Sequence, residues 1–305
     1  MTLGDRLAAA RTGAAAGPVE ARGLLRVSGR DARDYLHRMT TQHLAALPAG
    51  ESAYAAFLDG RGHLLGEGLV AARAADLLVV TERAEAAPLA AHLRKFVIAD
   101  DAAIEDVSDA HRVLAVLGPR GIEMARRLAG PGIEAVAATP RRGAQAVEVV
   151  ARADAAGPWR DRLLAEGAAD LTEADLEALR LEAGLARFGA DMGPDRLPME
   201  AGLTRDAIHF DKGCYVGQEV VLRATVRGHL QKGLVQLELP PGAGPGTRLR
   251  AGGQEVGWVT SAGETSRGRL GLGYARRAHW VPGAELETDA GKAVVRAVVV
   301  HEPEA

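Results

Sequence analysis

The sequence predicts an α+β fold that ends in a small antiparallel β-barrel. Between residues 22 and 227, strand-like apolar runs alternate with helical segments, and no long parallel crossovers join the strands. This alternation is typical of an α+β arrangement rather than of a doubly wound sheet. After residue 227 the pattern changes to short apolar segments separated by glycine- and proline-rich turns, which is typical of a small barrel.

The composition is that of an ordinary globular chain of 305 residues, which usually divides into two or three domains. A formal net charge of −3 argues against a broad nucleic-acid-binding surface, so we expect no direct contact with DNA. The single cysteine permits no intrachain disulfide. No apolar run approaches the ~20 residues of a membrane helix. We therefore expect a cytoplasmic protein with no membrane partner.

Most elements before residue 171 follow from apolar runs and turn residues. The alanine-rich residues 1–20 are interpreted as a short helical or weakly ordered N-terminus, with an organellar transit peptide as the alternative. A hairpin is expected where two apolar strands flank the turn from Asp59 to Gly62. The expected strands cover 24–27, 52–58, 64–70, 77–80, 112–117 and 146–150, and the expected helices cover 31–47, 84–96 and the segment after Pro119.

The helix after residue 171 is the most strongly specified element. Thr172 is a good N-cap, and Asp175 at the third helical position gives a variant of the capping box. Leu171 and Leu176 occupy the hydrophobic-staple positions, and Gly184 is a natural residue just beyond the end. We interpret this helix as a structural element that fixes the loop of residues 185–204.

The C-terminal part reads as a set of short strands. We expect them at 234–239, 248–249, 256–260, 270–274 and 293–300. The segment of residues 240–246, PPGAGPG, is a loop by composition, but it lies within the strand-rich region and marks no domain boundary.

Residues 210–219, FDKGCYVGQE, combine an unusual number of chemically special residues. Cys214 is the single cysteine, and Lys212 precedes it by two positions. A cysteine before a helix N-terminus and near a lysine is placed to be partly thiolate, so we expect Lys212 to favour the reactive form. Gly213 and Gly217 permit a tight turn or a close approach. The alternative is that Cys214 is a small buried apolar residue, as free cysteines usually are.

The motif K-G-C-Y-x-G-Q-E resembles the signature of the YgfZ family, folate-binding proteins of iron–sulfur cluster assembly and repair. That family is related to the T-protein, the aminomethyltransferase of the glycine cleavage system. Residues 180–200, RLEAGLARFGADMGPDRLPME, resemble a segment that both groups share. The resemblance implies two ferredoxin-like α+β subdomains before the barrel. We divide the chain into 1–50 with 110–225 as the folate-binding domain, 51–109 as an inserted subdomain, and 226–305 as the barrel.

The resemblance also implies a tetrahydrofolate site. In the T-protein family, the glutamate after the proline of this segment binds the pterin, and Glu200 matches that position. A carboxylate suits a pterin because its two oxygens meet the exocyclic amine and the adjacent ring N–H; the alternative is a solvated surface glutamate. Phe188 matches an aromatic residue beside folate, or is a core residue. We add Gln218 and Arg227 to the predicted site. The basic residues that face either the folate tail or solvent are Arg223, Arg227 and Lys232.

One departure from the T-protein bears on the reaction. Residues 62–70 read GHLLGEGLV, whereas the corresponding segment of aminomethyltransferases resembles G-G-x-x-D-D-L-x-V. The paired aspartates, one of which assists the folate chemistry there, are Gly66 and Glu67 in this chain. Without that aspartate, transfer loses the charge opposite the developing cationic nitrogen. We therefore expect folate binding without ordinary aminomethyl transfer.

Three functions remain open at this level. The first is a tetrahydrofolate-binding accessory factor for iron–sulfur clients or assembly proteins, with a link to tRNA modification through cluster-dependent enzymes. The second is a folate-dependent one-carbon transferase or demethylase that needs Glu67. The third is a nucleophilic-cysteine enzyme without folate. A cluster normally takes four thiolates, and the nine histidines show no paired metal spacing. We therefore expect no intrinsic metal, with Cys214 as a possible shared cluster ligand.

Overall fold

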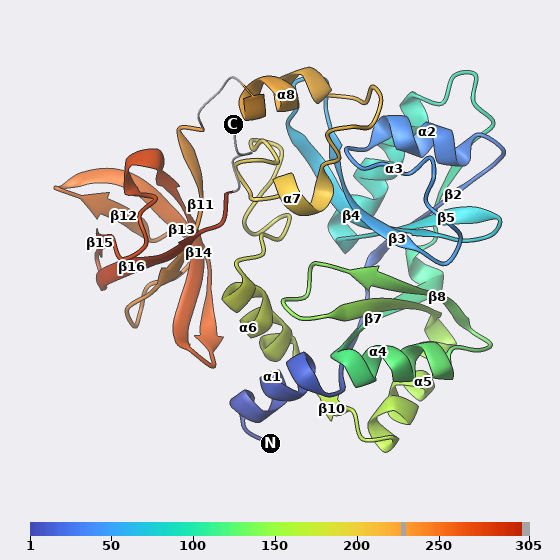
Figure 1. Ribbon diagram of the computed structural model, residues 1–305, viewed down its shortest axis with the longest axis horizontal. Coiled ribbons are helices and arrows are strands. Elements are labelled where there is room, and N and C mark those ends of the chain that lie inside the picture. The colour runs from blue at the N-terminus through green and yellow to red at the C-terminus, as the bar shows by residue number, and fades with distance from the viewer. Residues whose placement is uncertain (227–229, 301–305) are drawn as a thin grey trace.

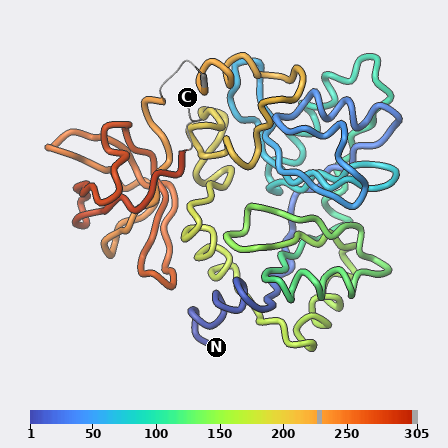
Figure 2. The backbone as a smooth tube through the Cα atoms, viewed as in Figure 1, coloured from blue at the N-terminus to red at the C-terminus, as the bar shows by residue number. Residues whose placement is uncertain are grey.

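The computed structural model describes residues 1–226 and 230–300, and it has an α+β architecture in three parts (Figure 1). Two parts each contain a five-stranded sheet with helices, and the third is a closed six-stranded barrel. Helix α6 (Glu173–Ala183) and the loop after it run between the barrel and the two sheets (Figures 1 and 2). The predicted fold class is confirmed.

The first sheet has the strand order β10-β1-β7-β9-β8, in which only β1 and β10 pair in parallel. Helices α4 and α5 cover one face, where Leu114, Met124 and Trp159 belong to one core cluster. The strands are β1 (Ala15–Glu20), β7 (His111–Leu117), β8 (Ile133–Thr139), β9 (Ala146–Arg152) and β10 (Ala169–Asp170). The helices are α1 (Leu3–Thr12), α4 (Pro119–Leu128) and α5 (Ala153–Ala165).

The second sheet has the order β3-β4-β5-β2-β6 and is entirely antiparallel. Its helices bury an apolar face against it, with Tyr35, Phe57 and Leu89 in one cluster. The strands are β2 (Gly23–Ser28), β3 (Ser52–Leu58), β4 (Leu64–Ala72), β5 (Asp76–Thr81) and β6 (Ala103–Asp106). The helical segments are α2 (Ala32–Met39), η1 (Arg83–Glu85), α3 (Ala86–Lys95) and η2 (Ser108–Ala110).

The barrel closes in the order β11-β14-β13-β12-β15-β16. Alternate residues such as Val235, Leu237, Val259 and Val295 fill its interior, as the period-two pattern of strands requires. The strands are β11 (Lys232–Glu238), β12 (Arg248–Ala251), β13 (Gln254–Thr265), β14 (Gly268–Arg276), β15 (Glu285–Thr288) and β16 (Gly291–Val298), with η3 (Arg277–His279) after β14. Two short helices precede the barrel, α7 (Thr204–Ala207) and α8 (Gln218–Val226).

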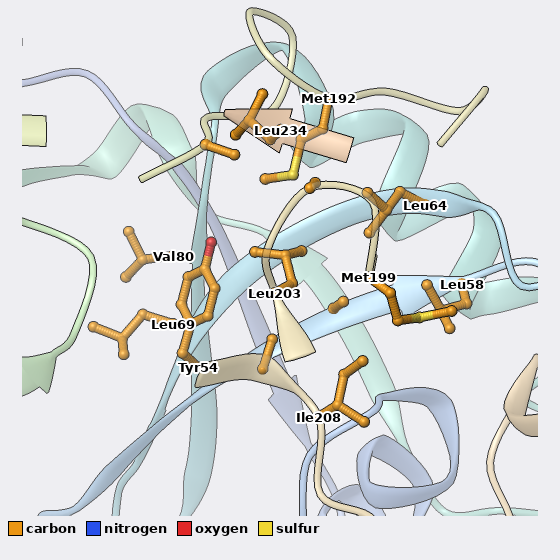
Figure 3. Close-up of a cluster of buried hydrophobic side chains, with 14 of the residues drawn as sticks. Tyr54, Leu58, Leu64, Leu69, Val80, Met192, Met199, Leu203, Ile208 and Leu234 are labelled. Carbon is orange, nitrogen blue, oxygen red and sulfur yellow. The ribbon is translucent and has the colours of Figure 1, made fainter. Parts of the chain in front are cut away.

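An apolar cluster joins the three parts (Figure 3). It gathers side chains from β3, β4 and β5, from the 192–208 segment and from β11, so the loop after α6 is packed between the second sheet and the barrel. The residues labelled in Figure 3 are Tyr54, Leu58, Leu64, Leu69, Val80, Met192, Met199, Leu203, Ile208 and Leu234. This central cluster holds the predicted site loops in fixed positions.

The strongly specified helix is confirmed as α6. Thr172 and Asp175 form the reciprocal capping box, and Gly184 ends the helix in the left-handed conformation. The N-terminal helix is also present, with its own capping box between Thr2 and Asp5. Among the described residues, none of the helices combines the length and the apolar character needed to cross a membrane.

Two local predictions were wrong for identifiable reasons. The helix expected at 31–47 ends at Met39, because Thr40 is extended and the Thr41 hydroxyl bonds to the carbonyls of Ala56 and Ala207 instead of continuing the helix. Strand β1 was not predicted, because its sequence AAGPVE lacks strand-favouring residues except Val19. The register shifts between Ala16 and Val19, which accommodates the proline.

The strand pairing bears on the predicted division of the chain. Residues 23–28 were assigned to the first unit, but β2 pairs with both β5 and β6 and therefore lies in the sheet of residues 52–106. Loss of β2 would expose the edges of two neighbouring strands, so it belongs structurally to that sheet. We propose 23–107 as the inserted unit, in place of 51–109.

Candidate functional site

The loop that carries Cys214 lies between α7 and α8, and the cysteine side chain is exposed. Lys212, two positions earlier, is only 6% exposed. Its ammonium donates hydrogen bonds to the carbonyls of Thr40 at 2.6 Å, Gln42 at 2.9 Å and His37. These three acceptors lie at and just beyond the end of α2. Lys212 therefore fastens the loop to that helix.

This geometry gives Lys212 contacts that were not predicted. We expected the ammonium to favour the Cys214 thiolate, but its three N–H groups are all used by backbone carbonyls. Among the described residues it forms no hydrogen bond to Cys214 and no ion pair. Burial lowers the pKa of Lys212 to about 7. The alternative interpretation of Cys214 as a buried apolar residue is wrong, because the side chain is exposed.

The other end of the loop is held by α8 and the β3–β4 hairpin. The Tyr215 N–H donates to the Gln218 side chain at 3.1 Å, and the Val216 N–H donates to the Arg38 carbonyl at 3.3 Å. Gly217 has a φ of +83°, and a Cβ there would lie 2.7 Å from the Asp59 carbonyl oxygen. The predicted need for glycine at 217 is therefore confirmed as a close approach to the hairpin turn.

A cavity of about 800 Å³ lies between the first and second sheets. Glu67 of β4 lines it and is 8% exposed. One carboxyl oxygen accepts the Phe188 N–H at 3.3 Å, whereas Oε2 is buried and has no hydrogen-bond partner among the described residues. Burial raises the pKa of Glu67 to about 7, and the charge of Arg141 acts in the opposite direction. Glu67 is thus a buried acid with one oxygen free for a ligand.

Charged side chains line another part of this cavity. Arg142 bonds to Glu148 at 3.1 Å and to Glu20 through both of its terminal nitrogens. Burial opposes the charge of Arg142, but Glu148 and Glu20 outweigh it and raise its pKa. Within the part of the chain that the structure describes, the second oxygen of Glu148 is, like that of Glu67, buried without a hydrogen-bond partner. The cavity therefore presents both cations and hydrogen-bond acceptors to a ligand.

Arg141 was not singled out from the sequence. Its guanidinium donates to the Ala186 carbonyl at 2.6 Å and lies 5.1 Å from the centre of the Tyr54 ring. Burial lowers the pKa of Arg141, while Glu67 supports its charge. Because β4, the turn after β8 and the 186–188 segment meet only in the folded chain, no spacing in the sequence signals this group.

Glu200 lies beside a different cavity, of about 680 Å³, together with Leu197, Lys232 and Arg276. It is half-buried, and its carboxylate accepts the Leu197 N–H at 3.5 Å. Burial raises the pKa of Glu200, while the charges of Lys232 and Arg196 oppose this shift. The surface-glutamate alternative does not fit this half-buried position.

The other predicted folate residues are dispersed. Phe188 is partly buried against the central cluster, and its N–H contacts Glu67 rather than Glu200. Gln218 begins α8 and accepts the Tyr215 N–H. Arg227 lies outside the described residues. The two carboxylates, Glu67 and Glu200, therefore lie at two separate cavities, and each offers an acceptor to a ligand.

A buried ion pair explains part of the segment 180–200. Arg180 on α6 contacts Asp191 at 2.5 Å, and Asp191 also accepts hydrogen bonds from Thr260 and Ser261 of β13. The Arg180 guanidinium donates to the Ser261 hydroxyl at 2.8 Å as well. These contacts join the helix, the site loop and the barrel. Asp191 is thus a structural residue.

Three histidine rings lie next to one another near the end of α2. The ring centres of His37 and His43 are 4.9 Å apart, and those of His43 and His209 are 5.3 Å apart. His37 and His43 are six residues apart, but His209 comes from a distant segment, so no spacing in the sequence indicates the group of three. Across the described ranges, no group of three or more histidine, cysteine, aspartate or glutamate side chains has an arrangement that could hold a metal ion.

Comparisons with known proteins agree with this architecture. The chain matches the GCVT N-terminal domain over residues 3–139 and the glycine cleavage T-protein C-terminal barrel domain over residues 232–304. An aminomethyltransferase of Saccharopolyspora erythraea is 30% identical, with 97% of this chain and 88% of the relative aligned. An aminomethyltransferase of Rubrobacter xylanophilus is 31% identical, with 87% of this chain and 77% of the relative aligned.

A solved structure shares the whole fold. The glycine cleavage system aminomethyltransferase T from Bartonella henselae superimposes with a TM-score of 0.82 at 23% identity, over 98% of this chain and 90% of that chain. At this identity the likeness concerns the fold. Together with the two matched domains and the relative at 30% identity, it leads to one assignment. The chain belongs to the aminomethyltransferase family, that of the glycine cleavage T-protein.

Proposed function

We propose that this protein is a tetrahydrofolate-binding accessory factor that helps to assemble or repair iron–sulfur clusters in client enzymes, with Cys214 as its functional thiol. The observation that carries the proposal is the exposure of the single cysteine on a loop fastened at both ends. Membership of the aminomethyltransferase family supports a folate-related function. The motif K-G-C-Y-x-G-Q-E supports the narrower role, through its resemblance to the YgfZ family.

An exposed thiol suits contact with a cluster that is cargo. A conventional iron–sulfur cluster takes four thiolate ligands, and the sequence contains one cysteine. Cys214 would contribute one ligand or one thiol exchange, and the remaining ligands would come from the client, a second copy of the chain or a small thiol. Accessibility at the surface is the property that such a transfer requires.

The cavity beside Glu67 fits a folate ring on two counts. Its volume of about 800 Å³ lies within the roughly 300–1,000 Å³ typical of ligand cavities. The buried Oε2 of Glu67 has no partner, and a ring that presents N–H donors would satisfy it. Tetrahydrofolate would supply a one-carbon acceptor nitrogen when bound.

Two carboxylates are candidates for binding the pterin. Glu200 is the candidate from the resemblance, with Lys232 of the same cavity available to the anionic glutamate tail. Glu67 is the candidate from the unpartnered oxygen, and Phe188 orients it through the backbone N–H. We propose that Glu200 anchors the pterin, with Glu67 of the separate cavity as the alternative anchor.

The state of Glu67 supports an accessory role over transfer. A one-carbon transfer through a cationic nitrogen gains from an ionised carboxylate opposite that charge. Burial raises the pKa of Glu67 to about 7, so near neutral pH a large fraction of this acid is uncharged. A neutral carboxyl still binds a ligand through hydrogen bonds, but it gives a developing cation much less stabilisation.

The second candidate function is aminomethyl transfer to tetrahydrofolate. Two observations favour it. The relatives at 30% and 31% identity are aminomethyltransferases. Glu67 lines the cavity, and it stands at the sequence position where the T-protein pattern has an aspartate. In this case Glu67 would stabilise the cationic nitrogen once ionised, and Cys214 would have no role in the reaction.

Two assays on the purified protein separate the candidates. Calorimetric titration with tetrahydrofolate measures binding, and product analysis measures 5,10-methylenetetrahydrofolate formed from an aminomethylated carrier. We expect binding without turnover, in wild type and in Glu67→Gln alike. Turnover that Glu67→Gln abolishes would establish the transferase instead. Absence of folate binding together with rapid Cys214 alkylation near neutral pH would favour a cysteine enzyme.

A further inference from the structure

We infer that Lys212 is a positioning residue, which holds the Cys214 loop in place by capping the C-terminus of α2. The inference deepens the proposed function, because it assumes that the Cys214 thiol meets a partner at a fixed site. In this inference Lys212 holds the loop of Cys214 in place, and it does not activate the thiol by its charge.

The end of α2 has carbonyls that the helix leaves unpaired. The last carbonyls of any helix lack an N–H four residues later. Here the N–H of Thr41, four residues after His37, is donated to Ala56 of the second sheet. The His37 carbonyl is consequently available, and the Lys212 ammonium donates to it and to the carbonyls of Thr40 and Gln42.

An ammonium group matches this position in number and in charge. It has three N–H donors and no acceptor, and three carbonyl oxygens surround it. The C-terminal end of a helix carries partial negative charge, which favours a cation. The Tyr215 ring, whose centre is 5.0 Å from Nζ, closes the remaining side. No carboxylate of the described residues competes for Lys212.

The charges around Lys212 favour a neutral His37 ring beside the cap. Burial lowers the pKa of His37, and Lys212 and His43 lower it further, whereas Asp34 opposes them. A neutral His37 ring accepts the N–H groups of Leu44 at 3.1 Å and Ala45 at 3.3 Å through Nδ1. These bonds fix the turn that supplies the acceptors. The positive charge of Lys212 thus helps to maintain the structure it binds.

The consequence for Cys214 is geometric. Lys212 fastens the loop to the end of α2, and the Val216 N–H fastens it again to the Arg38 carbonyl of the same helix. Between these two points, Gly213 and Cys214 are exposed. The thiol therefore moves with α2, and loss of the Lys212 cap would release one of its two attachments.

The test compares wild type with Lys212→Met, which removes every donor, and Lys212→Arg, which keeps the charge and the donors. Amide hydrogen exchange of residues 36–45 and 209–217 reports attachment, and the rate of Cys214 alkylation between pH 6 and 9 reports the thiol. For Lys212→Met we expect about tenfold faster exchange in both segments, as the loss of charge-assisted hydrogen bonds implies. Alkylation should accelerate most near pH 6, where Lys212 of wild type is mostly charged because its pKa is about 7. The ionisation of the thiol should be unchanged, and Lys212→Arg should recover much of the protection.

The opposite pattern would overturn the inference. Unchanged exchange in Lys212→Met, with a shifted pH midpoint of alkylation, would show that Lys212 acts on the thiol by its charge. Exchange in the barrel strands is the internal control for global unfolding, and Lys212→Gln, which keeps two N–H donors, replaces Lys212→Met if that variant does not fold. Failure of the proposed function is read separately, because Cys214→Ser keeps Lys212 and removes only the thiol.

Discussion

Replacement of Glu67 by glutamine should make the protein more stable at high pH and leave it nearly unchanged at low pH. The acid is 8% exposed, and burial raises its pKa from 4.5 to about 7. Because the folded-state pKa is above the unfolded value, the protonated acid is favoured in the folded chain. Its contribution is fully present below pH 4.5 and is lost as the pH rises through about 7.

The magnitude follows from the size of the pKa shift. Each unit corresponds to 1.36 kcal/mol, so ionisation of Glu67 costs the folded state about 3 kcal/mol by pH 8. Glutamine has nearly the same shape, keeps an oxygen for the Phe188 N–H and does not ionise. The variant should therefore gain up to about 3 kcal/mol over wild type at pH 8, with almost no gain near pH 4.5.

Urea denaturation of both proteins at pH 5, 6, 7 and 8 measures this difference directly. Groups that titrate in both chains largely cancel, so the gain of the variant should grow steadily with pH. A constant difference across the series would mean that Glu67 does not change its ionisation in this range. A less stable variant at pH 8 would mean that the ionised carboxylate is well paired, and the argument against transfer chemistry would fail with it.

Three further predictions concern other parts of the site. Glu200→Gln should weaken tetrahydrofolate binding by about tenfold or more, as expected for a lost charge-assisted contact, in calorimetric titrations where the exposed Glu219→Gln has no effect. Asp191→Asn should lower the free energy of unfolding by about 3 kcal/mol, because it leaves the buried Arg180 guanidinium short of a partner; a loss under 1 kcal/mol in denaturant titrations would contradict this. Gly217→Ala should lower the free energy of unfolding by about 2 kcal/mol, because φ is positive there and the added Cβ would lie 2.7 Å from the Asp59 carbonyl oxygen. Gly213→Ala should leave the stability almost unchanged, because the added Cβ would have nothing within 4 Å. Equal thermal shifts in the two variants would argue against a tight approach at 217.

Local sequence signals predicted the elements whose causes are local. The Thr172 and Asp175 cap and the terminal Gly184 specify α6 completely, and all three are found in their expected roles. The glycine- and proline-rich turns likewise indicated the barrel, because closure is the usual way for short antiparallel strands to avoid exposed edges. Periodicity and turn chemistry were sufficient for both.

Contacts between distant segments had no such signal. The acceptors for Lys212 lie at and just beyond the end of α2, 170 to 175 residues earlier, so its neighbour in sequence, Cys214, seemed the natural partner. Arg141 meets Glu67 only when the two sheets pack together. The membership of β2 in the second sheet depends on pairing with β5 and β6, and its own residues indicate only that it is a strand.

The central claim is tested most directly in cells that lack this protein. Activity of an iron–sulfur enzyme, such as a cluster-dependent tRNA-modifying enzyme, would be measured after complementation with wild type, Cys214→Ser or Asp211→Asn at matched expression. Asp211→Asn is the control, since it changes an exposed charge of the same loop and keeps the thiol. We expect wild type and Asp211→Asn to restore activity and Cys214→Ser to fail. Equal rescue by Cys214→Ser would contradict a functional thiol, and failure of wild type itself would favour the transferase.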